Sequence, residues 1–395
     1  MGRVLTHCGM GWSYAVDGGR LNYRPGMRRV PSLVPTPHPA IGFRVSPRRP
    51  QSAGARLRRL SPLFHYTVLL AWAVAPPAGA AVPPPETFAF AALGCLPYSR
   101  TPAAAEGFGR VIAEINRQAP AFTVHLGDIL GSDERCTDEL LAQRRADFDR
   151  FTSALVYTPG DNEWTDTHHA KAGGYVPTER LARLRRVFFA EERSLGQKPI
   201  ALVSQRHDAR FAEFVENARW TRGGVIFATV HVVGSKNNRQ AAVPGAMDEW
   251  RRRDLANEAW LHATFADATA TNAPGVALFF QADPFEADKD RGGYEPGFER
   301  FLVTLEKEAR AYGRPVLLVH ADEHRYRLEV GMRFNRDAPP IPNVTRLETF
   351  GAMNMHAVIV TVDPGSEQVF LPAALIVPGN ALPVLPRPKT LARQR

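Results

Sequence analysis

The sequence predicts an α/β domain in which sheets and helices form layers. Short apolar runs of the length of buried strands alternate with segments whose apolar residues recur at helical spacing. Several of these runs are followed directly by Gly-Asp or by other polar pairs. The 395 residues would suffice for one large domain or two small ones. We expect one domain over residues 86–380.

The elements of this domain follow from local patterns. The helix expected at 248–266 has Trp250, Leu255 and Trp260 as apolar anchors. Residues 165–218 contain few strand patterns and predict a helical cap or insertion, whereas the Pro-rich segment 332–343 predicts a loop. The other helices are expected around 108–115, 140–151, 179–189 and 301–312, and the strands at 88–93, 122–126, 154–158, 224–233, 275–282, 315–320, 356–362 and 368–377.

Residues 1–60 carry the positive charge of the chain. They hold eleven arginines, no lysine and one acidic residue, while the formal net charge of the whole chain is +9. The rest is therefore close to neutral and gives no indication of a nucleic-acid-binding face. The segment mixes Arg, Pro and Gly without a period and cannot bury enough apolar surface to fold. We expect a disordered basic extension, unless translation starts further downstream.

Residues 61–80 resemble a secretory signal peptide. Arginines precede the short apolar run "TVLLAWAVA", and the Ala-Gly-Ala at 78–80 fits the small-residue cleavage rule. An internal apolar helix is the alternative, but Pro76 and Pro77 would end it. About nine apolar residues span only about half of a bilayer core, so no stable membrane span is expected. The prediction is export to the periplasm or the medium.

Polar side chains follow the ends of four expected strands. They are Asp128, Asp161, Gln281, and the pair Asp322 and His324. In layered α/β folds, ligands collect outside the carboxyl ends of strands, so we expect these side chains to converge. Carboxylate, amide and imidazole donors suit Mg, Mn, Fe or Zn rather than soft metals.

Five blocks in order resemble the calcineurin-like metallophosphoesterases, over most of residues 86–330. The blocks read "LGCLPYS", "HLGDILG", "TPGDNEWTD", "FFQADP" and "VHADEHRY". "GDNEW" and "HADEH" are similar to motifs of a divergent bacterial branch of that superfamily. The resemblance implies a layered α-β-β-α sandwich of the metallo-dependent phosphatase type. It also implies a phosphoesterase that hydrolyses a small phosphorylated substrate with a metal-activated water.

The resemblance implies a metal site around Asp128, which would bridge ions, and His324. Asp161 and Asp322 stand where the family has an Asn and a His, and both retain an oxygen donor. Gln281 replaces a lone His and would be a weak ligand or would orient substrate. Each residue has a local alternative: a helix cap for Asp128, a turn for Asp161, a hydrogen-bond acceptor for Asp322 and a packed histidine for His324.

Cys95 departs from the family pattern at the position of its first metal-binding Asp. Three interpretations stay open: a thiolate zinc ligand, a disulfide with Cys136 in an oxidising compartment, or a small buried residue. Pro97 stands where the same block has its His. These losses predict one strong site rather than two for a divalent or trivalent ion such as Fe, Mn, Zn or Mg.

Asn162 and His231 are the candidate catalytic residues. Asn162 occupies the place of the His that assists the leaving group, and its amide can donate a hydrogen bond but no proton. His231, in "FATVHVV", would point into the cleft or pack within its strand. The departures also support a rival hypothesis, a non-catalytic protein of this fold that binds a ligand or partner. A hydrolase for a non-phosphate ester is a third.

Overall fold

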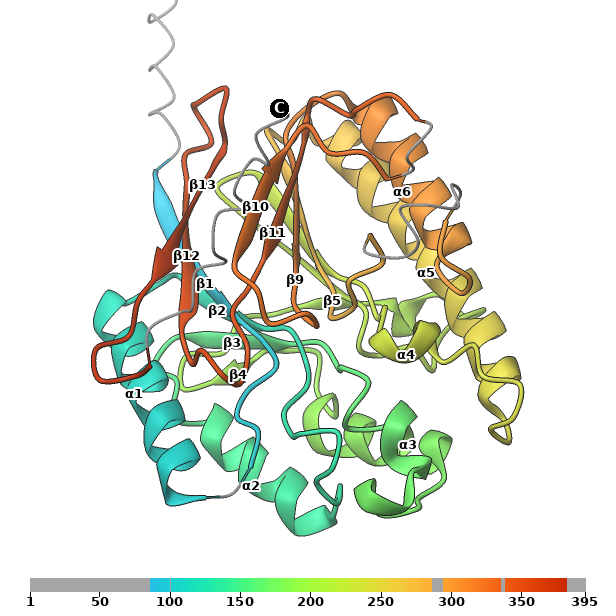
Figure 1. The fold of residues 1–395 in the computed structure, drawn as a ribbon. Coiled ribbons are helices and arrows are strands. Elements are labelled where there is room, and N and C mark those ends of the chain that lie inside the picture. Colours follow the sequence, from blue (N-terminus) through green and yellow to red (C-terminus); the bar gives the residue numbers. More distant parts are fainter. Residues whose placement is uncertain (1–85, 100, 286–293, 335–337, 382–395) are drawn as a thin grey trace, which may run out of the picture. The chain divides into compact units, whose positions relative to one another are not determined.

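The computed structural model describes residues 86–99, 101–285, 294–334 and 338–381 (Figure 1). All of them belong to one compact unit, Pro77–Arg395. The expected basic extension at 1–60 and the expected signal peptide at 61–80 lie outside the described residues, so these assignments and export stay predictions. No helix in the described ranges combines the length and the apolar character that a bilayer crossing requires.

One sheet has six strands, and its centre is parallel. Neighbouring strands β1, β2 and β3 run parallel, whereas β12, β13 and β4 pair antiparallel at the flanks. The spatial order is β13 (Phe370–Leu375), β12 (Ala357–Val362), β1 (Phe88–Leu93), β2 (Phe122–His125), β3 (Ala154–Tyr157) and β4 (Leu195–Gly196).

The second sheet has seven strands and is also mixed. Strands β7, β8, β9 and β11 run parallel, and β5, β6 and β10 pair antiparallel. The spatial order is β10 (Arg327–Val330), β11 (Val344–Glu348), β9 (Val316–His320), β8 (Val276–Phe279), β7 (Val225–Thr229), β6 (Ala218–Arg222) and β5 (Val203–Ser204).

Three apolar cores separate four layers. Phe90 and Val124 of the first sheet pack with Phe227 and Phe279 of the second, so the two sheets lie face to face. The outer face of the first sheet is covered by α1 (Pro102–Gln118), α2 (Asp138–Phe148) and α3 (Pro177–Phe188). The outer face of the second is covered by α5 (Ala246–Ala270) and α6 (Glu299–Tyr312), which lie side by side in Figure 1. The expected layered α/β fold is confirmed.

Helix starts follow from capping residues in the sequence. Thr101 accepts a hydrogen bond from the backbone N–H of Ala104 at the start of α1, and Thr137 does the same for Leu140 at the start of α2.

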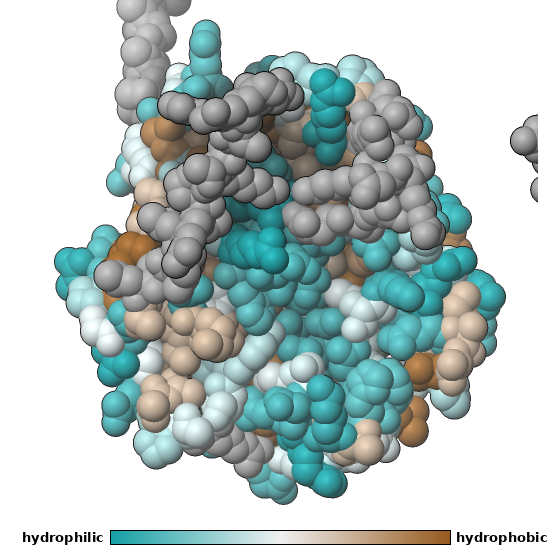
Figure 2. All heavy atoms as spheres, viewed as in Figure 1, coloured by the Kyte–Doolittle hydropathy of each residue, from teal (hydrophilic) through white to brown (hydrophobic). Residues whose placement is uncertain are grey.

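Figure 2 shows hydrophilic side chains over most of the visible face, with small, separate apolar patches. The buried apolar residues of α1, α2, α3, α5 and α6 pack in the cores against the sheets.

Several expected boundaries differ from the structure. The long strand expected at 224–233 ends at Thr229, and the chain then forms a short turn, α4 (Gly234–Asn237). Strands β6, β10 and β11 had no expected counterpart. The segment 165–218 contains α3 and the 3-10 turns Thr165–His168, Ala170–Ala172 and Gln205–His207, and it also contributes the edge strands β4 and β5.

Candidate metal centre

Three carboxylates from three strand ends converge. Asp128 follows β2, Asp161 follows β3 and Asp322 follows β9. Each contributes an oxygen, and the three oxygens lie within 4.8 Å of one another. Asp128 and Asp161 are buried, and Asp322 is partly buried. The structure thus brings together residues that are far apart in the sequence, as the strand-end pattern predicts.

Two glycines allow the first two carboxylates to approach. A Cβ atom on Gly160 would lie 2.1 Å from Asp128 Oδ1, and one on Gly127 would lie 2.2 Å from the Gly160 nitrogen. Gly127 also has φ +81°, a left-handed conformation that glycine adopts without strain. The two Gly-Asp turns therefore pack directly against each other.

Glu163 holds both turns in place. Its Oε1 accepts hydrogen bonds from the backbone N–H groups of Asp128 (3.1 Å) and Gly160 (2.6 Å) and from the Tyr157 O–H (2.8 Å). Burial raises the pKa of Glu163 to about 7. Sequence reasoning missed this residue, although it is the last letter of "GDNE".

The three carboxylates have no cationic partner in the described part of the chain, where no Arg or Lys forms an ion pair with Asp128, Asp161 or Asp322. Burial, followed by repulsion from Asp161, raises the pKa of Asp128 and of Asp322 well above the usual range. Burial, followed by the charge of Asp166, raises the pKa of Asp161 to about 6. Two buried acids and one partly buried acid that share no cation are electrostatically incomplete, and a metal ion would supply the missing charge.

Gln281 is the polar link among the three acids. Its amide nitrogen lies 3.3 Å from Asp128 Oδ2, 3.1 Å from Asp161 Oδ1 and 3.0 Å from Asp322 Oδ1. Its Oε1 accepts from the Gly234 N–H at 2.6 Å, which fixes the orientation of the amide. An amide N–H has no lone pair for a metal, so Gln281 as placed is a hydrogen-bond donor.

A second group of donors shares Asp128. Cys95, Asp128 and His324 each offer an atom within 4.8 Å of the others. The Cys95 thiol lies 3.4 Å from Asp128 Oδ2, and its sulfur accepts from the Asp322 N–H at 3.2 Å. Both Cys95 and Cys136 are free, and the Cys136 thiol donates to the Glu163 carbonyl at 3.2 Å. The disulfide interpretation is therefore wrong for this structure.

Asn162 is engaged with Tyr98 rather than exposed to a ligand. Its Nδ2 donates to the Tyr98 hydroxyl oxygen (3.0 Å) and to the Leu130 carbonyl (3.1 Å), so both amide hydrogens are used. The Tyr98 O–H donates to Asp128 Oδ2 at 2.8 Å, and its oxygen lies 3.2 Å from His324 Nε2. Tyr98 belongs to the site but was not predicted, because the family pattern has its metal-binding residues of that block at the positions of Cys95 and Pro97.

His231 lies in a different environment. Its ring is buried, with Nδ1 2.7 Å from Glu216 Oε1. Glu216 also binds Arg185, and the His231 ring packs on Trp164. Burial lowers the pKa of His231. Among the described residues, none of its hydrogen bonds or ring contacts is with Asp128, so the structure does not bring it to the carboxylate cluster.

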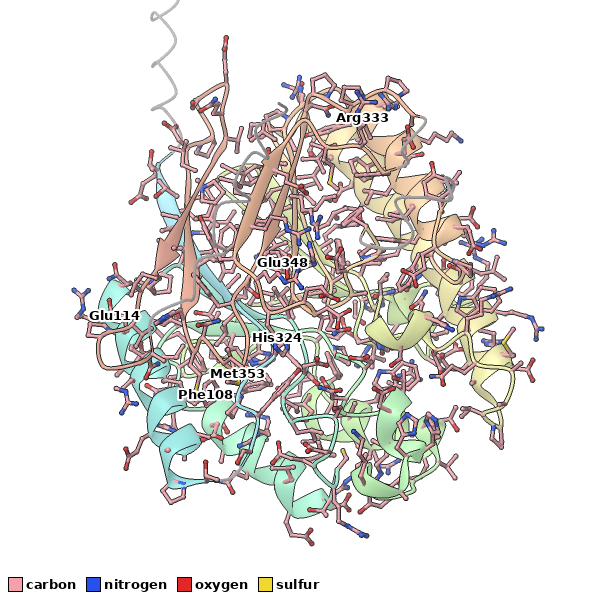
Figure 3. All side chains as sticks on the ribbon, viewed as in Figure 1. Phe108, Glu114, His324, Arg333, Glu348 and Met353 are labelled. Carbon is pink, nitrogen blue, oxygen red and sulfur yellow. The ribbon has the colours of Figure 1, made fainter. Side chains whose placement is uncertain are left out.

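A neighbouring acidic cluster already contains its cation. Asp283, His320 and Glu348 converge, and Arg346 lies among them (Figure 3 labels Glu348 and His324). Arg346 donates from Nε to His320 Nε2 at 2.8 Å, pairs with Asp283, and has an amino group 3.6 Å from Glu348 Oε2. The guanidinium offsets the charge of this cluster, whereas the three aspartates form no ion pair with any Arg or Lys that the structure describes.

Gly160→Ala tests the close packing of the turns. The new methyl group would displace the Asp128 carboxylate, so we expect metal affinity to fall at least about tenfold and the free energy of unfolding to fall by about 1–3 kcal/mol. Isothermal titration and urea unfolding measure the two effects. Gly109→Ala, inside α1 with only the end of Arg150 nearby at 3.3 Å, is the matched control and should stabilise by about 0.5–1 kcal/mol. Equal effects of the two changes would contradict the assigned packing.

No protein-family model matches the chain, and no curated protein matches it significantly. Among solved structures, it is similar to a dimetal phosphatase from Danio rerio (12% identity, TM-score 0.47, covering 74% of this chain and 99% of that one). It is also similar to GAP50, described as the anchor in the inner membrane complex of Plasmodium (11%, 0.40, 74% and 90%). A third is a purple acid phosphatase from yellow lupin, Lupinus luteus (11%, 0.44, 71% and 50%). All three TM-scores lie below 0.5, so the assignment of the fold rests on the sheets and helices themselves. Fold and site define an α/β protein with a candidate metal centre.

Proposed function

We propose that this chain is a metal-dependent phosphoesterase that hydrolyses a small phosphate ester. The observation that carries the proposal is the group of three converging carboxylates, with which no Arg or Lys of the described residues forms an ion pair. A phosphate ester is an anion, so it would be repelled by this site unless a cation were bound there. The ordered resemblance of the five sequence blocks supports the same activity.

The residues present fit a metal ion. Asp128, Asp161 and Asp322 would hold a hard cation through oxygen, and His324 adds an imidazole beside Asp128. When bound, such an ion would offset charge on the phosphoryl oxygens and activate water for attack. Glu163 holds the Asp128 turn in place by accepting its backbone N–H, and the Gln281 amide donates hydrogen bonds to the carboxylates.

The site lacks a proton donor at the position of Asn162. Both amide hydrogens of Asn162 are used within the protein, and an amide cannot protonate a leaving group. General acid catalysis typically contributes about 10²–10⁴ in rate. We therefore expect the enzyme to prefer esters whose leaving group needs no proton, such as nitrophenyl phosphates.

A series of aryl and alkyl phosphates tests this function. With Mn²⁺, Zn²⁺ or Fe³⁺ supplied, kcat/KM should be at least about 100-fold higher for p-nitrophenyl phosphate than for an alkyl phosphate. Equal rates for the two would show that an acid is present after all. Release of no phosphate from any ester by the metal-loaded chain would eliminate the proposed activity. Tight binding of inorganic phosphate in that case would instead favour the non-catalytic binding protein, a role that the fully engaged Asn162 amide also fits.

A further inference from the structure

We propose that Lys236 binds an oxygen of the phosphoryl group and so holds the substrate beside the carboxylate cluster. The inference rests on the proposed function and adds a cationic residue to its substrate site. Lys236 belongs to α4, the short turn that begins at Gly234, and it lies outside the five sequence blocks. Its place in the fold, its backbone conformation and its surroundings support the assignment.

The start of α4 touches the carboxylate cluster. A Cβ atom on Gly234 would lie 2.5 Å from Asp161 Oδ2 and 3.0 Å from Asp322 Oδ2. The Gly234 N–H also donates to Gln281, whose amide donates to the acids. Lys236 follows two residues later. An anion held over these carboxylates by a cation would therefore lie within reach of a lysine side chain at this position.

The backbone of this turn is left-handed over four consecutive residues, none of which is glycine. Their φ angles are +48°, +57°, +55° and +60° at Ser235, Lys236, Asn237 and Asn238. Residues with a Cβ adopt this region singly, and Asn tolerates it better than Ser or Lys. Such a run is unfavourable as local structure and persists only where the surroundings hold it. Strain of this kind clusters at ligand-binding and catalytic sites.

Buried polar groups hold the turn in this conformation. Arg253 of α5 is fully buried and donates to Asn237 Oδ1 (2.5 Å) and to the Asn237 carbonyl (2.9 Å). Asn237 Nδ2 donates to the Gly297 carbonyl at 2.9 Å, and Asn238 Nδ2 donates to Glu249 at 2.8 Å. Both asparagines are fully buried, and α4 lies beside α5 in Figure 1. The asparagines are therefore the anchors of the turn.

Lys236 is the exposed residue of the turn. Ser235 is half-buried, and its hydroxyl donates to Asp166 at 2.6 Å. Lys236 forms no ion pair with any residue that the structure describes. Burial raises the pKa of Glu295 and the charge of Lys236 opposes this rise, but no ion pair joins the two. The anchored turn thus presents an ammonium group with three donors, and such a group is a common phosphate binder.

Binding of inorganic phosphate to the Mn²⁺-loaded full chain tests the role of Lys236. In isothermal titration at pH 7, Lys236→Gln should bind phosphate about 10- to 100-fold more weakly than the wild type, because a hydrogen bond between charged groups is lost. Its Mn²⁺ affinity should stay unchanged, since Lys236 is not a metal ligand. Lys236→Arg keeps the charge and should recover most of the phosphate affinity.

Lys198→Gln is the matched control. Lys198 is also an exposed lysine, and it follows Gln197, whose N–H donates to the Phe151 carbonyl before the start of β3. It therefore lies at the end of β3 opposite Asp161, and its loss should leave phosphate affinity unchanged. Equal losses in Lys198→Gln and Lys236→Gln would reduce the effect to net charge and overturn the inference.

Lys236→Gly is a second variant that separates binding from folding. Glycine adopts a φ of +57° without strain, so this variant should unfold at a urea concentration no lower than that of the wild type. It should nevertheless lose phosphate affinity as Lys236→Gln does. Unchanged phosphate affinity in this variant would overturn the inference.

The outcomes also separate the role of Lys236 from the proposed function. Wild-type phosphate affinity in Lys236→Gln, with phosphate esters still hydrolysed, would overturn the role of Lys236 and leave the phosphoesterase in place. Phosphate binding that depends on Lys236, without turnover of any ester, would support the inference and count against the phosphoesterase. Failure of the Mn²⁺-loaded wild type to bind phosphate would overturn the inference, and the ester assay would then decide the proposed function.

Discussion

Asp128→Asn is expected to reduce metal affinity more than about 100-fold and to lower phosphate release to background. Asp128 is common to both donor groups, so its charge would be lost from each. Even partners of metal ligands typically contribute about 10- to 100-fold to affinity, and a shared ligand should exceed that. Equilibrium dialysis with Mn²⁺ and Zn²⁺ measures the affinity, and the aryl phosphate assay measures the rate.

Asp208→Asn is the matched control for this change. Asp208 is a surface carboxylate paired with Arg210, and its loss should leave both affinity and rate unchanged. An Asp128→Asn variant that binds metal as the wild type does would place the ion elsewhere.

Metal should stabilise the chain strongly at pH 8 and weakly at pH 5. In the metal-free protein, burial and repulsion raise the pKa of Asp128 and Asp322, and raise that of Asp161 to about 6. The contribution of these carboxyl groups to the free energy of unfolding is fully present below their pKa in the unfolded chain, about 4. It is lost as the pH rises through their higher pKa values in the folded protein. A bound cation removes this loss. At a free metal concentration 1,000 times Kd, binding raises the free energy of unfolding by about 4 kcal/mol.

Buried histidines require a control variant in this experiment. Burial lowers the pKa of His125 to about 4, so its contribution to the free energy of unfolding increases as the pH rises from 5 to 7. This change is opposite in sign to that of the carboxyl groups. Asp128→Asn retains these histidines. Without metal, its unfolding midpoint should therefore rise relative to that of the wild type as pH increases from 5 to 8. A midpoint difference that is constant with pH, or metal that stabilises equally at both pH values, would contradict the electrostatic account.

The positions of the candidate ligands could be predicted from the sequence, because these residues come directly after the apolar runs that form the strands. Asp128 and Asp161 follow neighbouring parallel strands of the first sheet, and Asp322 follows a strand of the second sheet, which packs face to face with the first. Strand β11 escaped prediction for the opposite reason. It carries Arg346 and Glu348, both buried, and charged residues inside a core have no apolar period to detect.

Side-chain roles were less predictable than positions, because they depend on contacts between distant segments. Tyr98 reaches Asp128 and His324 across 30 and 226 residues of sequence. The amide orientation of Gln281 is fixed by the Gly234 backbone, which no sequence pattern reveals. His231 was expected to be able to face the cleft, yet it pairs with Glu216 from a neighbouring segment.

Anomalous diffraction from crystals of the full chain soaked in Mn²⁺ or Zn²⁺ tests the metal centre most directly. We expect a peak within about 2.0–2.6 Å of a carboxylate oxygen of Asp128. A peak among Asp283, His320 and Glu348 instead, or no peak at Asp128 under saturating metal, would contradict it.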